Sequence, residues 1–138
     1  FLPGAPPRSV GHQALAVNLS DLAAMGAEPA WALLSLSLPD SDEAWLELFA
    51  AGLYALADQH GVALVGGDTV RGPRVVTVTA LGLVEPQLAL RRAGAQPGDV
   101  LFVSGWPGEA AAGLEALRTG GAQGADDALV RRYAKAKS

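Results

Sequence analysis

Two strand-like segments of this chain follow one another too closely to be joined by a helix. Residues 62–65 form a short apolar run, and residues 74–84 are rich in β-branched side chains that alternate between two faces. A parallel pair of strands needs a crossover of about a dozen residues or more. We therefore expect these two segments to pair as an antiparallel hairpin.

The rest of the chain alternates between helical and strand periodicity. Proline at position 39 and glycine at position 61 bound two of the segments. The spacing of apolar residues predicts a helix over 10–26 with a possible break near Asn18, a strand over 31–38, a helix from the capping residues 40–42 to about 60, a strand over 100–104, a helix over 109–118 and a helical stretch within 126–136.

These elements predict an α+β fold with a mixed, mainly antiparallel sheet and helices on one face. A sheet without helices on its other face would expose apolar side chains, so we expect a partner subunit to cover that face. A stretch rich in Pro, Gly and Arg over 85–99 indicates a domain boundary. We assign residues 1–88 to a first domain and residues 89–138 to the beginning of a second one.

Composition excludes several classes of function. The chain has no cysteine, which removes disulfides, thiolate metal sites and cysteine nucleophiles. Its two lysines, Lys135 and Lys137, lie in a polar tail, so a P-loop lysine or a buried Schiff-base lysine is not expected. The net charge of −4 argues against nucleic acid as a partner. The longest apolar run, 30–38, is too short to span a membrane, and a soluble, cytoplasmic protein is expected.

Two aspartates stand among small residues at places where elements end. Asp21 has a structural interpretation, in which it or Ser20 caps a second helical segment, and a functional one as a ligand residue. Asp68 follows Gly66 and Gly67, and this sequence is typical of either a hairpin turn or a site where backbone approaches phosphate and a carboxylate holds a hard cation. One carboxylate rarely holds Mg²⁺ at a triphosphate, so the functional interpretation needs both aspartates to converge on one metal cluster.

Basic and imidazole side chains give weaker indications. Arg91 and Arg92 lie at the expected domain boundary, where a guanidinium could bind phosphate oxygens or simply be solvated. His12 and His60 have no companions at metal-ligand spacing, which favours ordinary surface or capping roles. The glycines at 105, 108 and 113 do not have the spacing of a dinucleotide-binding fingerprint.

Three blocks, in this order, resemble the thiamine-monophosphate kinases. The first is Phe-Leu-Pro-Gly at 1–4 followed by the segment 10–27, whose Asn-Leu-Ser-Asp sequence is the most specific feature of the three blocks. The second is Gly-Gly-Asp-Thr at 66–69 with Arg-Gly-Pro at 71–73, and the third is 91–99 running into 103–105. The resemblance covers nearly the whole chain to about Leu117.

The resemblance implies transfer of the γ-phosphoryl group of ATP to thiamine monophosphate, with several Mg²⁺ ions at the nucleotide. It implies metal binding by Asp21 and Asp68, an ATP contact by Gly67 and Asp68, and a phosphate contact by Arg92. No residue acts as a covalent catalyst, because phosphoryl transfer depends on positioning and charge neutralisation. The implied fold is that of the aminoimidazole-ribonucleotide synthetase superfamily, in which the N-terminal sheets of two subunits form a shared barrel, so a homodimer is expected.

The resemblance also implies that other parts of the site lie outside residues 1–138. A substrate-contacting histidine and further metal-binding aspartates would precede Phe1, and further metal and nucleotide ligands would follow Ser138. We therefore expect residues 1–138 on their own to have no kinase activity. Two alternatives remain open: another ATP-using enzyme of the superfamily, in hydrogenase maturation or selenophosphate synthesis, or a dimerisation module without catalysis.

Overall fold

The computed structural model describes residues 4–103, 105–119 and 131. The chain divides into two compact units, Phe1–Gly94 and Ala95–Ser138, which are described separately. The domain assignment of 1–88 and 89–138 stays a prediction. Within the described residues, no helix has the length and apolar character needed to cross a membrane.

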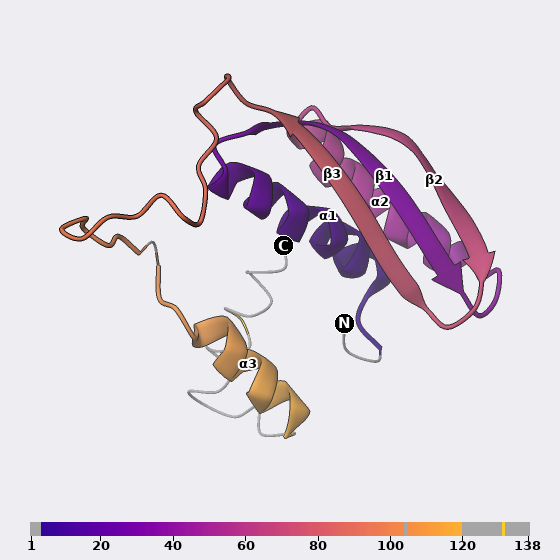
Figure 1. The fold of residues 1–138 in the computed structure, drawn as a ribbon. Helices are drawn as coiled ribbons and strands as arrows, with labels where there is room; N and C mark the ends of the chain where they lie inside the picture. The colour runs from indigo at the N-terminus through magenta and orange to yellow at the C-terminus, as the bar shows by residue number, and fades with distance from the viewer. Residues whose placement is uncertain (1–3, 104, 120–130, 132–138) are drawn as a thin grey trace. The chain divides into compact units, whose positions relative to one another are not determined.

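The first unit is a three-stranded sheet with two helices on one face (Figure 1). Its elements are α1 (Pro7–Ala24), β1 (Glu28–Leu38), α2 (Glu43–Gln59), β2 (Ala63–Arg71) and β3 (Val75–Leu83). The strand order is β2-β1-β3, with β2 parallel and β3 antiparallel to β1. The expected mixed sheet with helices on one side is confirmed.

The expected hairpin between residues 62–65 and 74–84 is wrong, because β1 lies between β2 and β3. Helix α2 is the crossover that places β2 parallel to β1 on one edge. The chain then passes over the end of β1, where the Gly72 nitrogen donates to the Leu38 carbonyl at 2.8 Å, and β3 pairs on the other edge. The short connection therefore reverses the chain direction without making the two strands neighbours.

The Gly66-Gly67-Asp68-Thr69 sequence is part of β2, so the turn interpretation is also wrong. Ala32 pairs with Leu64 and Leu33 with Gly66, which leaves Val65 as an extra residue in a bulge. Gly67 has a φ of 153°, and a Cβ there would overlap the Leu34 carbonyl. Glycine is needed at this position because β1 approaches the backbone of β2 too closely for a side chain.

The sequence explains how α1 and α2 begin. Proline occupies the first turn of α1, where its missing N–H costs nothing. The predicted break near Asn18 is wrong, since α1 runs without interruption and the Asn18 side-chain amide donates to the Ala14 carbonyl at 2.8 Å. At the start of α2 the Asp42 carboxylate accepts from the Trp45 nitrogen at 3.0 Å, as the capping residues predict.

The core lies between the helices and the sheet. Helices α1 and α2 cross closely at two glycines: a Cβ on Gly11 would overlap the Phe49 carbonyl oxygen, and one on Gly52 would overlap that of Arg8. Phe49 and Leu15 are the largest fully buried side chains. The buried apolar residues of this unit are Val10, Leu15, Ala32, Leu36, Leu38, Trp45, Phe49, Leu53, Leu56, Ala57 and Val62.

The other face of the sheet, called here the open face, carries neither α1 nor α2, the two helices described in the first unit (Figure 1). Side chains alternate across β1 and β3, so residues opposite one another in register share a face. The open face includes large apolar side chains that are about half exposed. They are Trp31, Leu33, Val75, Leu81 and Leu83.

In the second unit, helix α3 (Glu109–Arg118) begins after Gly108 and confirms the predicted helix. The predicted strand over 100–104 is wrong for residues 100–103, which form neither helix nor strand, and Ser104 lies outside the described residues. The described part of this unit contains no strand for them to pair with, and an unpaired strand leaves its backbone groups without partners. The predicted helical stretch within 126–136 also lies outside the described residues, apart from Arg131.

Candidate functional site

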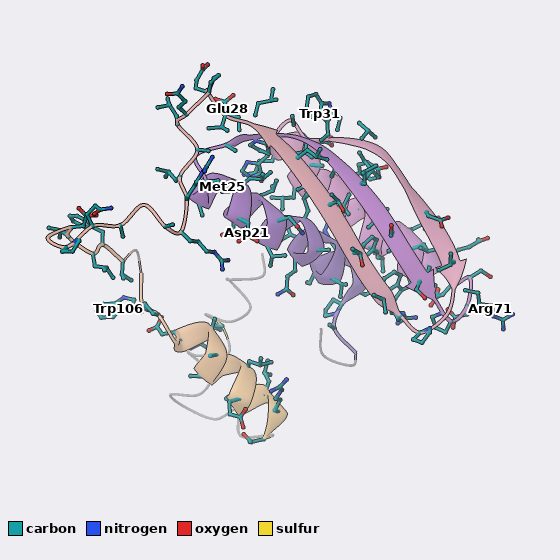
Figure 2. The ribbon with its side chains drawn as sticks, in the orientation of Figure 1. Asp21, Met25, Glu28, Trp31, Arg71 and Trp106 are labelled. Atoms are coloured by element: carbon teal, nitrogen blue, oxygen red, sulfur yellow. The ribbon has the colours of Figure 1, made fainter. Side chains whose placement is uncertain are left out.

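Asp21 lies near the end of α1 and lines a cavity of about 580 Å³. The other residues around this cavity, called here the α1 pocket, come from the end of the helix and from the segment after β3. They are Ala24, Met25, Leu90, Arg91 and Arg92. Figure 2 labels Asp21 on α1 and Met25, the C-cap residue that follows the helix. Because α1 is continuous through Asp21, the interpretation of Ser20 or Asp21 as a cap for a second helix is wrong.

The α1 pocket brings two guanidinium groups and one carboxylate together. Neither Arg91 nor Arg92 has an ion pair within the part of the chain that the structure describes, where Arg74 pairs with Asp40 at 3.9 Å. No hydrogen bond to the Asp21 carboxylate is found among the described residues either. Unpaired guanidinium groups suit phosphate oxygens, and a free carboxylate beside them suits a hard cation that bridges to the same phosphate.

Gly67 and Asp68 lie elsewhere, on edge strand β2. Asp68 is opposite Ser35 of β1, and Ser35 is opposite Thr77 of β3, so Asp68 belongs to the open face. Its carboxylate is exposed and accepts a hydrogen bond from the Thr69 nitrogen at 2.8 Å. This leaves most of its acceptor capacity available.

The structure thus brings Asp21 and Arg92 to one pocket and leaves Gly67 and Asp68 away from it. Helix α1 packs on α2, β1 and β3 but not on β2, and it covers the face of the sheet opposite to Asp68. In residues 4–103, 105–119 and 131 no three acidic or histidine side chains form a group that could hold a metal ion. Convergence of Asp21 and Asp68 within a single chain is therefore not what the fold provides.

The residues of the α1 pocket fit a magnesium–phosphate group in part. Mg²⁺ in nucleotide sites is held by one or two carboxylates together with phosphate oxygens and water. Asp21 is exposed and free of a hydrogen-bonded side-chain partner in the described residues, so its carboxylate can be one such ligand. A second protein carboxylate has to come from outside this pocket.

Sequence reasoning did not identify three members of the α1 pocket, Ala24, Met25 and Leu90. Ala24 and Met25 are far from Leu90 in the sequence, and no spacing rule connects a helix end to a loop after a later strand. The one sequence signal was an apolar residue, Leu90, standing directly before two arginines in a polar segment.

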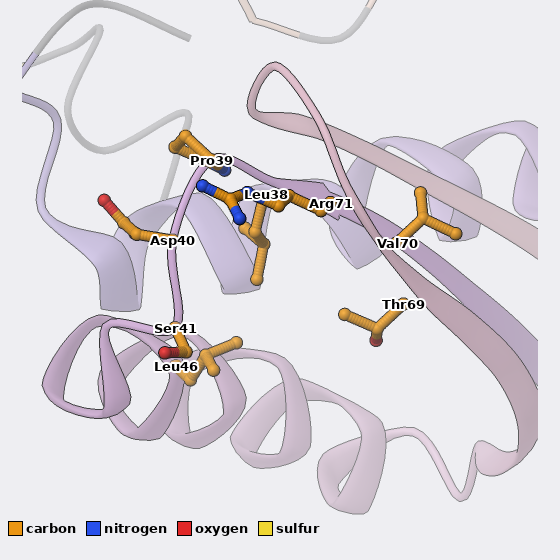
Figure 3. A pocket seen from close by; sticks show the side chains of 8 residues that line it. All are labelled: Leu38, Pro39, Asp40, Ser41, Leu46, Thr69, Val70 and Arg71. Atoms are coloured by element: carbon orange, nitrogen blue, oxygen red, sulfur yellow. The ribbon is translucent and has the colours of Figure 1, made fainter.

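A second cavity, of about 490 Å³, lies at the ends of β1 and β2 beside the start of α2 (Figure 3). It is lined by Leu38, Pro39, Asp40, Ser41, Leu46, Thr69, Val70 and Arg71. Acidic Asp40 and basic Arg71 both line it, and Asp40 already pairs with Arg74, whose guanidinium lies 4.7 Å from the centre of the Trp45 ring. None of the predicted site residues lines this cavity, and its mixed charge indicates no particular ligand.

Comparison with known proteins gives a consistent result. Residues 1–84 match the family described as AIR synthase related protein, N-terminal domain. The chain is 53% identical over 118 residues to the thiamine-monophosphate kinase of Escherichia coli (strain K12), covering 86% of this chain and 36% of that protein. The chain therefore spans about a third of the length of this relative.

Two solved structures of similar proteins agree with the fold. The thiamine-monophosphate kinase from Stenotrophomonas maltophilia K279a has a TM-score of 0.82 and 50% identity, with 89% of this chain and 41% of that chain covered. AaThiL complexed with AMPPCP and TMP has a TM-score of 0.84 and 34% identity, with 96% of this chain and 43% of that chain covered. These values correspond to a shared fold over nearly the whole of this chain.

Proposed function

The chain belongs to the family of AIR synthase related proteins, and on that premise we propose that the protein carrying it is a thiamine-monophosphate kinase. Its reaction would transfer the γ-phosphoryl group of ATP to thiamine monophosphate and give thiamine diphosphate. The observation that carries this proposal is the identity of about half of all aligned residues with kinases of that name. The related structure that contains AMPPCP, an ATP analogue, and TMP supports the same pair of substrates.

The α1 pocket is proposed as the nucleotide-phosphate end of the site. Arg92 donates to phosphate oxygens and neutralises charge that spreads over them as the γ-phosphoryl group moves. Asp21 would hold Mg²⁺, which would supply positive charge at the phosphate end of the nucleotide. Arg91 lines the same pocket and adds positive potential there.

The open face is proposed as the contact between two copies of the chain. Trp31, Leu33 and Leu81 are partly exposed on this face. Together they form an apolar patch of the kind that marks protein interfaces. A contact between two identical faces is self-complementary and closes into a dimer. Because Asp21 and Asp68 lie on opposite faces of the sheet in one protomer, we further propose that a site using both aspartates takes Asp21 from one protomer and Asp68 from the other.

The proposed function is tested by following thiamine diphosphate formation from ATP and thiamine monophosphate in the presence of Mg²⁺. The protein that carries this sequence should form product, and Asp21→Asn and Arg92→Ala should each lower kcat/KM about a hundredfold. Asp58→Asn is the matched control, since Asp58 is an exposed carboxylate on α2 that does not line the α1 pocket. Absence of thiamine diphosphate with the unmodified protein would disprove the kinase assignment.

The superfamily alternatives are less well supported. Hydrogenase-maturation and selenophosphate-forming activities would need a relative of those names at comparable identity, whereas the proteins about 50% identical to this chain carry the kinase name. In the same assay, hydrolysis of ATP that does not depend on thiamine monophosphate would favour such an alternative.

A further inference from the structure

One residue attaches the arginine-bearing segment to the end of α1. The Leu90 nitrogen donates to the Met25 carbonyl at 3.0 Å. This carbonyl belongs to the C-cap residue of α1, where carbonyl groups lack helical partners. The Leu90 N–H thus provides a hydrogen-bond partner for a carbonyl at the end of α1. It also holds the segment that precedes Arg91 against this helix.

The Leu90 side chain adds a second contact at the same place. Its Cγ and Cδ1 atoms lie 3.9 Å from the position that a Cβ on Gly26 would occupy, so the side chain lies over the Gly26 backbone. Gly26 has a φ of 72°, in the left-handed region that favours glycine. A Cβ at position 26 would only touch Leu90 at van der Waals distance, so the left-handed backbone rather than lack of space favours glycine there.

These contacts fix the arginines relative to the carboxylate. The Met25 nitrogen bonds to the Asp21 carbonyl at 3.2 Å, so Asp21 and the acceptor for Leu90 belong to one helical turn. Arg91 and Arg92 follow Leu90 directly, and all of these residues line the same cavity. The separation between the guanidinium groups and the Asp21 carboxylate therefore depends on the attachment at Leu90.

We propose that Leu90 is a positioning residue that holds Arg91 and Arg92 at the distance from Asp21 at which one nucleotide phosphate chain contacts all three. The proposal rests on the proposed function of the α1 pocket. It assigns Leu90 no contact with the reacting atoms. Leu90 acts by keeping the two guanidinium groups and the Asp21 carboxylate in one arrangement before the nucleotide binds. This reduces the entropy lost when the nucleotide orders them.

The experiment compares Leu90→Ala with Leu88→Ala in the protein that carries this sequence. Leu88 is a matched control, because it is 66% exposed against 62% for Leu90 and its nitrogen bonds within its own turn, to the Glu85 carbonyl. The measurements are the Kd for AMPPCP with Mg²⁺, the KM values for ATP and thiamine monophosphate, kcat and Tm. We expect Leu90→Ala to weaken AMPPCP binding and raise the KM for ATP about tenfold, a loss that a misplaced charged contact can produce.

Three further results define the proposal. The KM for thiamine monophosphate and the Tm should stay close to those of the unmodified protein, Leu90→Met should restore most of the AMPPCP affinity, and Leu88→Ala should change nothing. A Leu90→Ala protein that binds AMPPCP normally, while Asp21→Asn and Arg92→Ala bind it weakly, would overturn the positioning role and leave the proposed function intact.

Two other outcomes would also be decisive. If Asp21→Asn and Arg92→Ala bind AMPPCP as the unmodified protein does, the α1 pocket is not the nucleotide site and the proposed function of the pocket fails with it. If Leu90→Ala lowers Tm and alters all kinetic constants to the same extent, Leu90 only stabilises the fold and the positioning role is disproved.

Discussion

The two faces of the three-stranded sheet differ in how completely this chain covers them. On one face α1 and α2 exclude water from Ala32, Leu36 and Leu38, and the helices cross so closely that glycine is required at two positions. On the open face Trp31 and Leu81 lie opposite one another and each remains about two-fifths exposed. One face of the sheet is therefore completed within the chain, whereas the other leaves large apolar side chains partly exposed.

The largest expected effect tests whether one active site combines Asp21, on the helix-covered side of one protomer, with Asp68, on the open face of the other. Asp21→Asn and Asp68→Asn should each reduce turnover at least about a hundredfold. When the two variants are combined in one dimer, one of its two sites receives Asp21 from one protomer and Asp68 from the other, both unmodified. That mixed dimer should regain about half of the activity of the unmodified dimer.

Differently tagged copies, co-expressed and purified through both tags, provide the mixed dimer. The two homodimeric variants treated in the same way are the controls and should stay inactive. An inactive mixed dimer would show that both carboxylates act within one protomer, and the proposed sharing of the site would be wrong.

The next largest effect tests the covered face. Gly11→Ala places a Cβ against the Phe49 carbonyl, and backbone cannot move aside as a side chain can. We expect the free energy of unfolding to fall by about 3 kcal/mol, measured by urea unfolding. Gly94→Ala is the control, since its Cβ would lie 3.4 Å from the Arg91 carbonyl in an exposed loop, and it should change the stability little. Equal stabilities of the two variants would mean that the helices separate without cost.

A smaller effect on stability but a clear effect on association is expected at the open face. Leu81→Glu puts a charge on this face and should convert dimers to monomers in sedimentation experiments while the protomer stays folded. Leu48→Glu is the matched control, because Leu48 is 48% exposed on α2 against 44% for Leu81 on β3. If Leu81→Glu remains dimeric, the open face is not the contact between protomers.

The smallest effect concerns the start of α2, on the covered face. Asp42→Ala removes the carboxylate that accepts from the Trp45 nitrogen, and such caps contribute about 1 kcal/mol to stability. Ser41→Ala, one residue earlier, should change thermal unfolding by less than Asp42→Ala does. If Ser41→Ala lowers the stability more than Asp42→Ala does, Asp42 is not the residue that caps α2.

The sequence predicted the types of most elements of the first unit, and the reasons are local. The stripe of apolar residues in α2, its Asp42 cap and the alternation in β1 and β3 depend on residues within one turn or one strand of each other. The prediction failed where pairing decides the structure. The Gly-Gly-Asp-Thr sequence has turn composition, yet it pairs along β1 as part of β2.

The site shows the same limit. Asp21 and Arg92 could be proposed from the sequence, and the fold places both at one pocket. Leu90 and Met25 could not be connected, because the hydrogen bond that joins them depends on how the chain after β3 returns to the end of α1. The face on which Asp68 lies follows from strand register, and the position of Asp21 follows from the packing of α1 on β1 and β3, neither of which a single segment encodes.

By itself the sequence determined the type of most helices and strands in the first unit, where α2 begins, and which charged residues stand apart from the core. Only the tertiary structure decided that β1 is the central strand, that Asp68 lies on the open face, and that Leu90 holds two arginines beside Asp21. The physical reason is range: periodicity and capping act between residues a few positions apart. Strand neighbours and pockets depend on which distant segments bury one another's apolar surface.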